Sequence, residues 1–190
     1  MARFHQSQIR HDVATNRPVA AAVNIALKNA TRKDETCELI ERHRDRLSLP
    51  LDDDAIAHGG VHIHNVLSCE KQVSLIDFEN CGQGSAYDDL SLICSQLTCM
   101  GLAAHVPARR VIACRDALLE SYNDCRGIDR EVLGRTITAR VCGYYVTGFC
   151  SGTPRPTVLG VPLLRGHVRS LVESLLSREP AVVLRMSPAV

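Results

Sequence analysis

Residues 58–79 read H-G-G-V-H-I-H-N-V-L-S-C-E-K-Q-V-S-L-I-D-F-E and hold the clearest structural signal in the chain. Two short runs rich in apolar and β-branched residues, 65–68 and 73–76, flank a four-residue polar break. This pattern predicts a β-hairpin. The amide Asn65 opens the first run and the carboxylate Asp77 follows the second, so such a hairpin would bring the two side chains together.

Away from this hairpin the pattern is mainly helical. Near the C-terminus, apolar residues recur at the spacing of one helix face: Leu164, Val168, Leu171, Val172, Leu175 and Leu176. Helices are expected over 18–28, 33–47, 87–102, 107–122, 129–145 and 163–177, with a short strand at 55–57 and loops at 82–85 and 151–162. The acidic run 52–54 is expected to be a solvated turn after the second helix. These elements predict a mainly α fold with a small β-hairpin.

The composition suits one globular domain built on aliphatic packing. The chain has 190 residues, of which 45% are hydrophobic and only 4% aromatic, with no Trp. A chain of this length buries a substantial core, and a core of Leu, Val, Ile and Ala favours helices packed on helices. We expect a single domain over 1–190, with a helical lead-in (1–54), a loop and hairpin region (55–86) and a helical body with its tail (87–190).

Charge and cysteine content limit the compartments and partners that we expect. A formal net charge of +1 gives no basic footprint for nucleic acid, and no apolar run reaches the ~20 residues of a membrane-spanning helix. The N-terminus lacks the apolar core of a signal peptide. Nine cysteines without C-x-x-C spacing argue against a disulfide framework or a thiolate zinc site. We expect a reducing cytoplasm, with Cys94, Cys99 and Cys114 packed as small hydrophobes.

The side chains around the hairpin suit metal-assisted phosphoryl transfer. That chemistry needs divalent cations that bridge the phosphates, ligands that hold them, and a base that orients the acceptor hydroxyl. Asn65 and Asp77 offer an amide and a carboxylate at a suitable spacing. The H-x-x-x-H-x-H spacing of His58, His62 and His64 offers an alternative, a zinc site with three protein ligands.

At these residues the chain resembles the aminoglycoside phosphotransferase and choline kinase superfamily. The catalytic loop of that family typically reads H-G-D-x-H-x-x-N and is followed by an I-D-F-(E/D) turn. The matching positions are His58, Gly59, His62, Asn65 and the four residues 76–79, followed by Gly84 and the pair Asp89-Leu90. The resemblance is specific over roughly residues 55–95. It implies the fold of the C-terminal lobe of a protein-kinase-like phosphotransferase.

The resemblance also implies roles for individual residues. Asn65 and Asp77 would bind Mg²⁺, with ATP as the phosphate donor and a small hydroxylated molecule as the acceptor. His58 and His62 would organise the loop, while Asp89 would hold its backbone and Glu79 would support the site. Apart from the resemblance, Asp77 suits a turn, Glu79 a surface ion pair, and one acid of the Asp88–Asp89 pair a helix N-cap.

One position departs from the family pattern, because Gly60 stands where the family carries its catalytic aspartate. Glycine cannot accept a proton, and the loss of a positioned acid–base group costs about 10²–10⁴-fold in rate. We therefore expect either an impaired kinase or a catalytically dead pseudokinase that acts as a binding or scaffold subunit. The groups that would have to substitute for the aspartate are His62, His64 or the acids at 52–54.

A second departure concerns the nucleotide-binding lobe of the family, which has five strands and a phosphate-contacting Lys. The residues before His58 show helical patterns and no Gly-rich loop, and neither Lys28, Lys33 nor Lys71 lies in a buried strand pattern. We expect a C-terminal lobe alone, either truncated or naturally reduced. Self-association or a partner chain would then cover the surface that normally meets the other lobe.

Overall fold

The computed structural model describes residues 19–48, 55–70, 72–102, 107–152, 157–158 and 161–179. Its helices are α2 (Val19–Asn29), α3 (Glu35–Arg42), α4 (Arg44–Leu47), α5 (Ala86–Met100), α6 (Ala108–Arg126), α7 (Arg130–Cys150), α8 (Arg165–Ser177) and the 3₁₀ turn η1 (Ile63–Asn65). Its strands are β1 (Ala55–Ala57), β2 (Val66–Cys69), β3 (Gln72–Leu75), β4 (Gly82–Gly84), β5 (Thr157–Val158) and β6 (Val161–Pro162). The expected mainly α fold with a small hairpin is confirmed.

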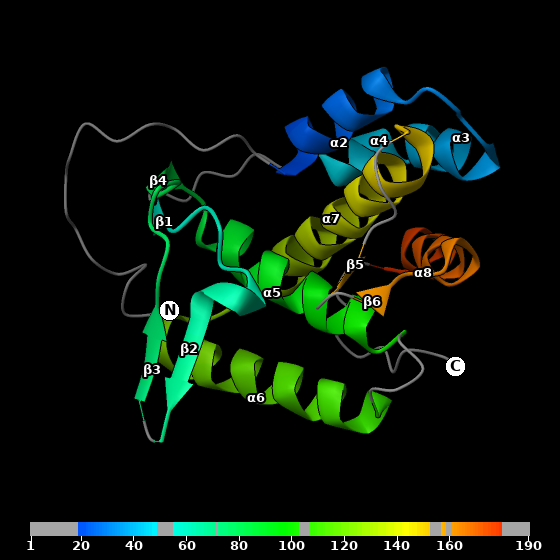
Figure 1. The fold of residues 1–190 in the computed structure, drawn as a ribbon. Coiled ribbons are helices and arrows are strands. Elements are labelled where there is room, and N and C mark those ends of the chain that lie inside the picture. The colour runs from blue at the N-terminus through cyan, green and yellow to red at the C-terminus, as the bar shows by residue number, and fades with distance from the viewer. Residues whose placement is uncertain are drawn as a thin grey trace.

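Helix α7 lies at the centre of the helical body (Figure 1). It contacts α2, α4, α5 and α8, and its buried apolar side chains point in several directions: Leu133, Ile137, Val141, Cys142, Tyr145 and Val146. A helix that is apolar on several sides belongs inside a bundle. At its start, the Asp129 carboxylate accepts hydrogen bonds from the Glu131 and Val132 amides at 2.9 and 3.1 Å, as expected of an N-cap.

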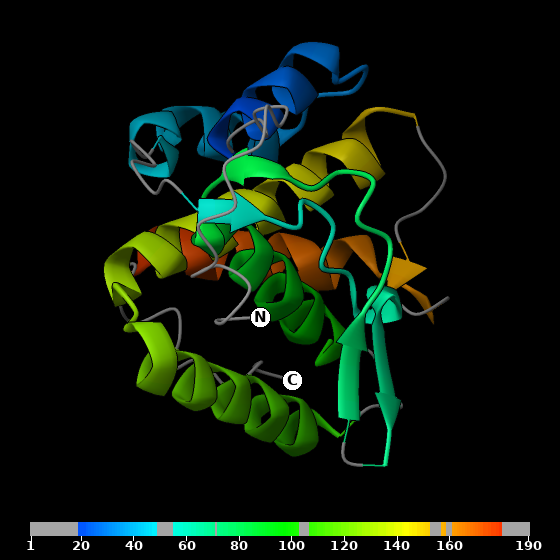
Figure 2. The same cartoon turned by 90° about the vertical axis from the view of Figure 1, so that its left-hand side faces the viewer.

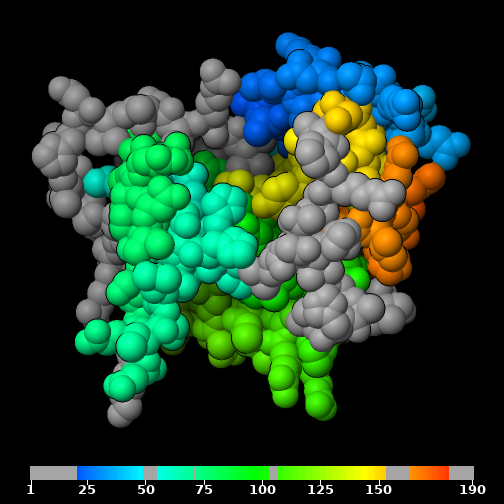
Figure 3. Space-filling model, viewed as in Figure 1, coloured from blue at the N-terminus to red at the C-terminus, as the bar shows by residue number. Residues whose placement is uncertain are grey.

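The predicted hairpin is present and projects from one side of the helical body (Figure 2). Strands β2 and β3 pair antiparallel, with Val66 opposite Leu75 and Cys69 opposite Gln72. Their side chains are largely exposed. The space-filling view shows this segment forming part of the molecular surface next to the helices (Figure 3). Asp77, just beyond β3, is exposed, and Asn65, just before β2, is partly exposed.

The prediction of a loop at 82–85 is wrong, because Gly82–Gly84 forms β4 and pairs antiparallel with β1. A Gly-Gln-Gly sequence has no side-chain pattern of a strand, so only the partner strand reveals it. Ser85 then caps α5, its Oγ accepting a hydrogen bond from the Tyr87 amide at 3.1 Å. The N-cap suggested for Asp88 or Asp89 is therefore also wrong; both lie inside the first turn of α5.

The single helix expected over 33–47 is broken at His43 into α3 and α4. The His43 ring nitrogen Nδ1 lies 2.9 Å from the Leu39 carbonyl oxygen, which also accepts a hydrogen bond from the His43 backbone amide at 3.2 Å. The Arg46 guanidinium donates to the carbonyl oxygens of Leu176 and Arg178. Helix α4 is thus held against the end of α8 rather than in line with α3.

Three further expectations need correction, and a fourth lies outside the described residues. The expected loop at 151–162 contains the antiparallel pair β5–β6. Cys114 is exposed whereas Cys94 and Cys99 are buried, and Leu164 is 60% exposed because it precedes α8 and does not lie on its buried face. The acidic run 52–54 falls outside the described residues. No helix among those described has the length and apolarity needed to cross a membrane.

Candidate active site

The loop after β1 is fixed by Asp89 from the first turn of α5. Its carboxylate oxygens accept hydrogen bonds from the backbone amides of His58 at 2.6 Å and Gly59 at 3.0 Å. Asp89 is only 1% exposed, and the N-terminal end of α5 favours its negative charge. Gly59 has φ of 77°, a conformation that glycine adopts without steric cost. The β1–β4 pair and α5 therefore set the path of the loop.

His58 connects this loop to the segment after the hairpin. Its ring is buried, and Nε2 lies 2.9 Å from the carbonyl oxygen of Ile76. Because a carbonyl only accepts hydrogen bonds, Nε2 carries the proton. The ring also contacts Phe78, with 4.4 Å between the ring centroids. The loop and the residues beyond β3 are thus held together as one unit.

The hairpin brings Asn65 and Asp77 together. The Ile76 amide donates to the Asn65 carbonyl oxygen at 3.0 Å, which extends the β2–β3 pairing by one step and places Asp77 next to Asn65. The Asn65 side-chain nitrogen donates to Asp77 Oδ2 at 3.3 Å and to the Gly60 carbonyl oxygen at 2.8 Å. These two bonds orient the amide and leave its oxygen as the atom available to a cation.

Asp77 has a left-handed backbone, with φ of 66°. Asp is among the few side chains that adopt this conformation regularly. Its side chain is exposed, so the carboxylate is accessible from solvent. An exposed carboxylate beside an oriented amide oxygen is a hard oxygen donor pair of the kind that Mg²⁺ prefers.

Gln96, which the sequence analysis did not single out, holds the middle of the loop. Its side-chain nitrogen donates to His62 Nδ1 at 2.7 Å, and its oxygen accepts from the Ile63 amide at 2.9 Å. Gln96 lies two helical turns after Asp89 on α5, so both face the loop. Burial, Arg140 and His64 lower the pKa of His62, while Asp77 acts to raise it. Because Nδ1 accepts the hydrogen bond from Gln96, the proton of the neutral ring lies on Nε2.

Arg140 from α7 is a second contributor that the sequence analysis missed. Its Nε donates to Ser91 Oγ at 2.8 Å and its Nη2 to the Asp88 carbonyl oxygen at 2.7 Å. Burial lowers the pKa of Arg140, while the nearby Tyr144, Asp88 and Asp89 act to raise it. Arg140 thus ties the start of α5 to α7 and supplies positive charge beneath the loop.

Gly60 lies among the loop side chains. A Cβ atom added there would lie 3.9 Å from His58 Nδ1 and 4.0 Å from both Asn65 Nδ2 and His62 Cδ2. These are ordinary van der Waals distances, and the Gly60 φ lies outside the left-handed region. The loop therefore has both the space and the backbone conformation for a larger residue at this position, but it carries no carboxylate there.

The remaining candidate residues do not join this cluster. His64 is exposed on η1, and the donor atoms of His58, His62 and His64 do not converge as a metal site would require. The alternative zinc site is therefore wrong. Glu79 is exposed in the turn after β3 and forms no hydrogen bond or ion pair within the described part of the chain.

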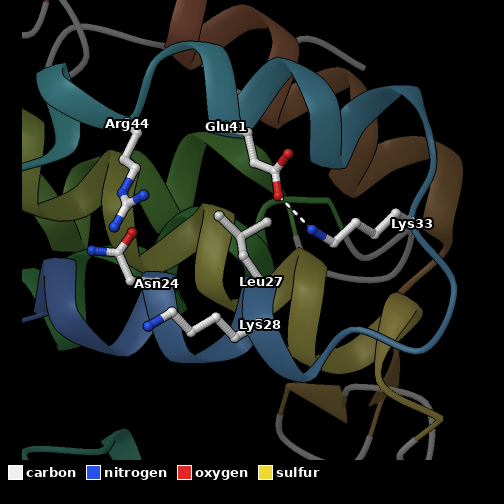
Figure 4. A pocket seen from close by; sticks show the side chains of 6 residues that line it. All are labelled: Asn24, Leu27, Lys28, Lys33, Glu41 and Arg44. Carbon is white, nitrogen blue, oxygen red and sulfur yellow. Dashed lines mark hydrogen bonds and ion pairs between the residues drawn. The ribbon is translucent and has the colours of Figure 1, made fainter.

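A separate open cavity of about 330 Å³ lies between α2 and the α3–α4 pair (Figure 4). Its lining residues are Asn24, Leu27, Lys28, Lys33, Glu41 and Arg44. Lys33 and Glu41 form an ion pair at 2.5 Å, so the cavity keeps an excess of positive charge from the other two cations. It shares no lining residue with the loop and hairpin cluster, which comprises His58, Gly60, His62, Asn65, Asp77, Asp89 and Gln96.

The family assignment comes from comparison with family models. The chain matches the model of APH, a phosphotransferase enzyme family, over residues 2–132. It belongs to this family. No curated protein and no solved structure matches it significantly. The matched region of this APH-family chain includes the loop, the hairpin, Asp89 and Gln96, whereas Arg140 lies beyond it.

APH-family proteins generally use ATP and Mg²⁺. In this member, the exposed Asp77 carboxylate and the oriented Asn65 amide fit the oxygen ligands that Mg²⁺ takes, usually with several waters retained. The described residues before β1 form α2, α3 and α4. They contain no β-sheet and no Gly-rich loop of the kind that contacts the phosphates of a nucleotide.

Proposed function

We propose that this chain is a kinase-like phosphotransferase domain that transfers the γ-phosphate of ATP to a hydroxyl of a small molecule, at a reduced rate. The observation that supports the proposal is the hydrogen-bonded pair of Asn65 and Asp77 at the base of an exposed hairpin. Asn65 Oδ1 and the Asp77 carboxylate would hold Mg²⁺. A metal held there would supply positive charge to a transferred phosphoryl group.

Each other residue of the cluster then has a positioning role. Asp89 fixes the loop backbone, and His58 holds the segment that carries Asp77. Gln96 fixes η1, from which Asn65 projects. Such positioning supplies much of the catalysis in phosphoryl transfer, where the protein performs little covalent chemistry.

The reduced rate follows from the absence of a base at Gly60. His62 does not replace it, because its only lone pair, on Nδ1, accepts the hydrogen bond from Gln96 at 2.7 Å. Nε2 carries the proton and cannot accept another. The same observation favours the second candidate function, a pseudokinase that binds a ligand or partner without turnover.

The test is a calorimetric titration of the protein with ATP in the presence and absence of Mg²⁺. We expect Mg²⁺-dependent binding that weakens at least about tenfold in Asp77→Asn, which keeps the side-chain shape and tolerates the left-handed backbone. Glu79→Gln is the matched control, since it removes a nearby exposed charge and should bind as the unaltered protein does. Absence of Mg²⁺-dependent nucleotide binding in the unaltered protein would contradict the kinase proposal.

Self-association is proposed for the exposed apolar residues beside the hairpin. Leu67, Val73, Ile76 and Phe78 are all more than two-fifths exposed. The register places Leu67 and Val73 on opposite faces of the hairpin, so both faces carry exposed apolar surface that a second copy could cover. We expect a dimer or larger species in sedimentation velocity at micromolar concentration. A strict monomer at that concentration would leave a different partner chain as the candidate.

A further inference from the structure

A compact group of potential metal ligands lies away from the loop and hairpin cluster. Cys37 in the first turn of α3 and Cys150 at the end of α7 are 0% and 1% exposed, and their sulfur atoms lie 3.4 Å apart. Asp34, the N-cap of α3, completes the group, in which one donor atom from each residue lies within 4.8 Å of the others. Within the described ranges, these are the residues whose donor atoms converge in this way.

We propose that Asp34, Cys37 and Cys150 bind a thiophilic divalent cation, with Zn²⁺ as the natural candidate. Zn²⁺ takes thiolate sulfurs at about 2.3 Å, which places two sulfurs of a tetrahedral site about 3.8 Å apart. The two sulfurs need to separate by only a few tenths of an ångström from the observed 3.4 Å. A disulfide would require them to approach to about 2.0 Å, a much larger movement inside a packed core.

The surrounding charges suit a bound dication. Two thiolates and the Asp34 carboxylate carry three negative charges, of which a divalent cation neutralises two. The Arg165 guanidinium lies 2.6 Å from Asp34 Oδ2 and neutralises the third. The Tyr145 hydroxyl donates to the same oxygen at 2.5 Å. Hydrogen bonds of this kind orient a ligating carboxylate.

Binding of the cation to the two thiols would replace two S–H bonds with two metal–sulfur bonds and release two protons to solvent, so the affinity should rise with pH.

The site has access to solvent on one side. The Asp34 side chain is 23% exposed, so a cation can enter past the carboxylate and keep a water as its fourth ligand. A cation there would link the start of α3 to the end of α7, two segments that are far apart in sequence. Because only the folded chain assembles these ligands, binding would stabilise the native state.

The proposal is tested by titrating the reduced protein with Cd²⁺, a spectroscopic substitute for Zn²⁺. Exposed Cys69, Cys114 and Cys125 are first replaced by Ser to remove background binding. We expect one equivalent of Cd²⁺ to bind, an ultraviolet sulfur-to-cadmium charge-transfer band of two thiolates, and a higher melting temperature with Zn²⁺. Competition with a chelator should give an affinity that rises with pH.

Single variants distinguish metal binding at this site from metal binding by other cysteines. Cys150→Ser should lose the band and the rise in melting temperature, while Cys94→Ser, buried elsewhere on α5, should keep both. Asp34→Asn preserves an N-cap residue and should weaken binding. Circular dichroism of the metal-free variants checks their folding. Two results would overturn the proposal. One is that the protein with only the exposed cysteines replaced binds no Cd²⁺ at micromolar concentration; the other is that a folded Cys150→Ser variant binds Cd²⁺ equally well.

Discussion

The side-chain nitrogen of Asn65 lies 3.3 Å from Asp77 Oδ2, although twelve positions and a complete β-hairpin separate them in sequence. The pairing of the Ile76 amide with the Asn65 carbonyl oxygen, at 3.0 Å, brings the two side chains together. The relationship therefore depends on the register of β2 and β3, and a slip by one residue would turn these side chains to opposite faces.

The left-handed backbone at Asp77 allows its ligating role to be separated from its contribution to stability. Asp77→Val places a β-branched side chain at φ of 66° and should lower the free energy of unfolding by about 1–3 kcal/mol. Asp77→Gly removes the carboxylate without that strain and should be close to neutral in stability. Urea denaturation measures both. Equal stability of the two variants would show that the backbone is not constrained at this position.

Asp89 should make a large contribution to stability for a single buried side chain. Asp89→Ala removes the acceptors of the His58 and Gly59 amides and leaves buried donors, a change expected to cost about 2–4 kcal/mol. Asp124→Ala, an exposed change on α6, should be almost neutral. Hydrogen exchange by NMR should show faster exchange of the two loop amides in Asp89→Ala. Unchanged protection of these amides would contradict the role given to Asp89.

The sequence predicted those elements whose own residues carry a clear helix or strand pattern. The β2–β3 hairpin and helices α2, α5, α6, α7 and α8 follow from periodicity and breakers within each segment. Strand β4 did not, because two of its three residues are glycines and only pairing with β1 makes it a strand. The break at His43 coincides with a ring contact with Leu39, which a charge pattern does not encode.

The site was predictable only in part for the same reason. Asn65, Asp77, His58 and Asp89 lie in a short motif, whereas Gln96 reaches His62 across 34 positions and becomes visible only when α5 packs under the loop. Cys37 and Cys150 lie 113 positions apart. Local C-x-x-C spacing cannot detect such a pair.

The His62–Gln96 contact gives a prediction about pH. The pKa of His62 is lowered below 6.5, so the loop contributes stability above that pH and loses it as the pH falls toward the folded-state pKa. Gln96→Glu would place a carboxylate beside the ring, stabilise the imidazolium and raise the pKa of His62 above its present value. NMR titration of the ring measures the change. A His62 pKa that does not rise would show that Gln96 does not contact the ring in solution.

Asp34 should control stability in acid. Partial burial acts to raise its pKa, but hydrogen bonds from Tyr145, the Cys37 amide and Arg165 outweigh burial and lower the pKa from 3.8 to about 2. The stabilisation is therefore complete above about pH 4 and is lost as the pH falls toward 2. Its size is below about 2 kcal/mol, since solvent screens a partly exposed group. Asp34→Asn should flatten the denaturation profile in this window, whereas Glu35→Gln, at an exposed position on the same turn, should not.

Gly60→Asp tests whether the missing carboxylate is the main defect of the site. The added Cβ would meet its nearest neighbours at 3.9–4.0 Å, so the variant should fold without displacing His58, Asn65 or His62. If the metal ligands are otherwise in place, a carboxylate here should raise phosphoryl transfer by about 10²–10⁴-fold. The proposed acceptor is a small hydroxylated molecule, so the assay measures ATP hydrolysis and phosphoryl transfer to each of a panel of amino alcohols.

Gly60→Asn is the matched control, because it has the same shape but no proton acceptor. It should fold like Gly60→Asp and remain at the rate of the unaltered protein, so a difference between the two variants isolates proton transfer from packing. If Gly60→Asp binds Mg²⁺ and ATP yet stays as slow as Gly60→Asn, the missing base is not the main cause of the low rate. The cluster around Asn65 and Asp77 would then serve binding, as the pseudokinase alternative requires.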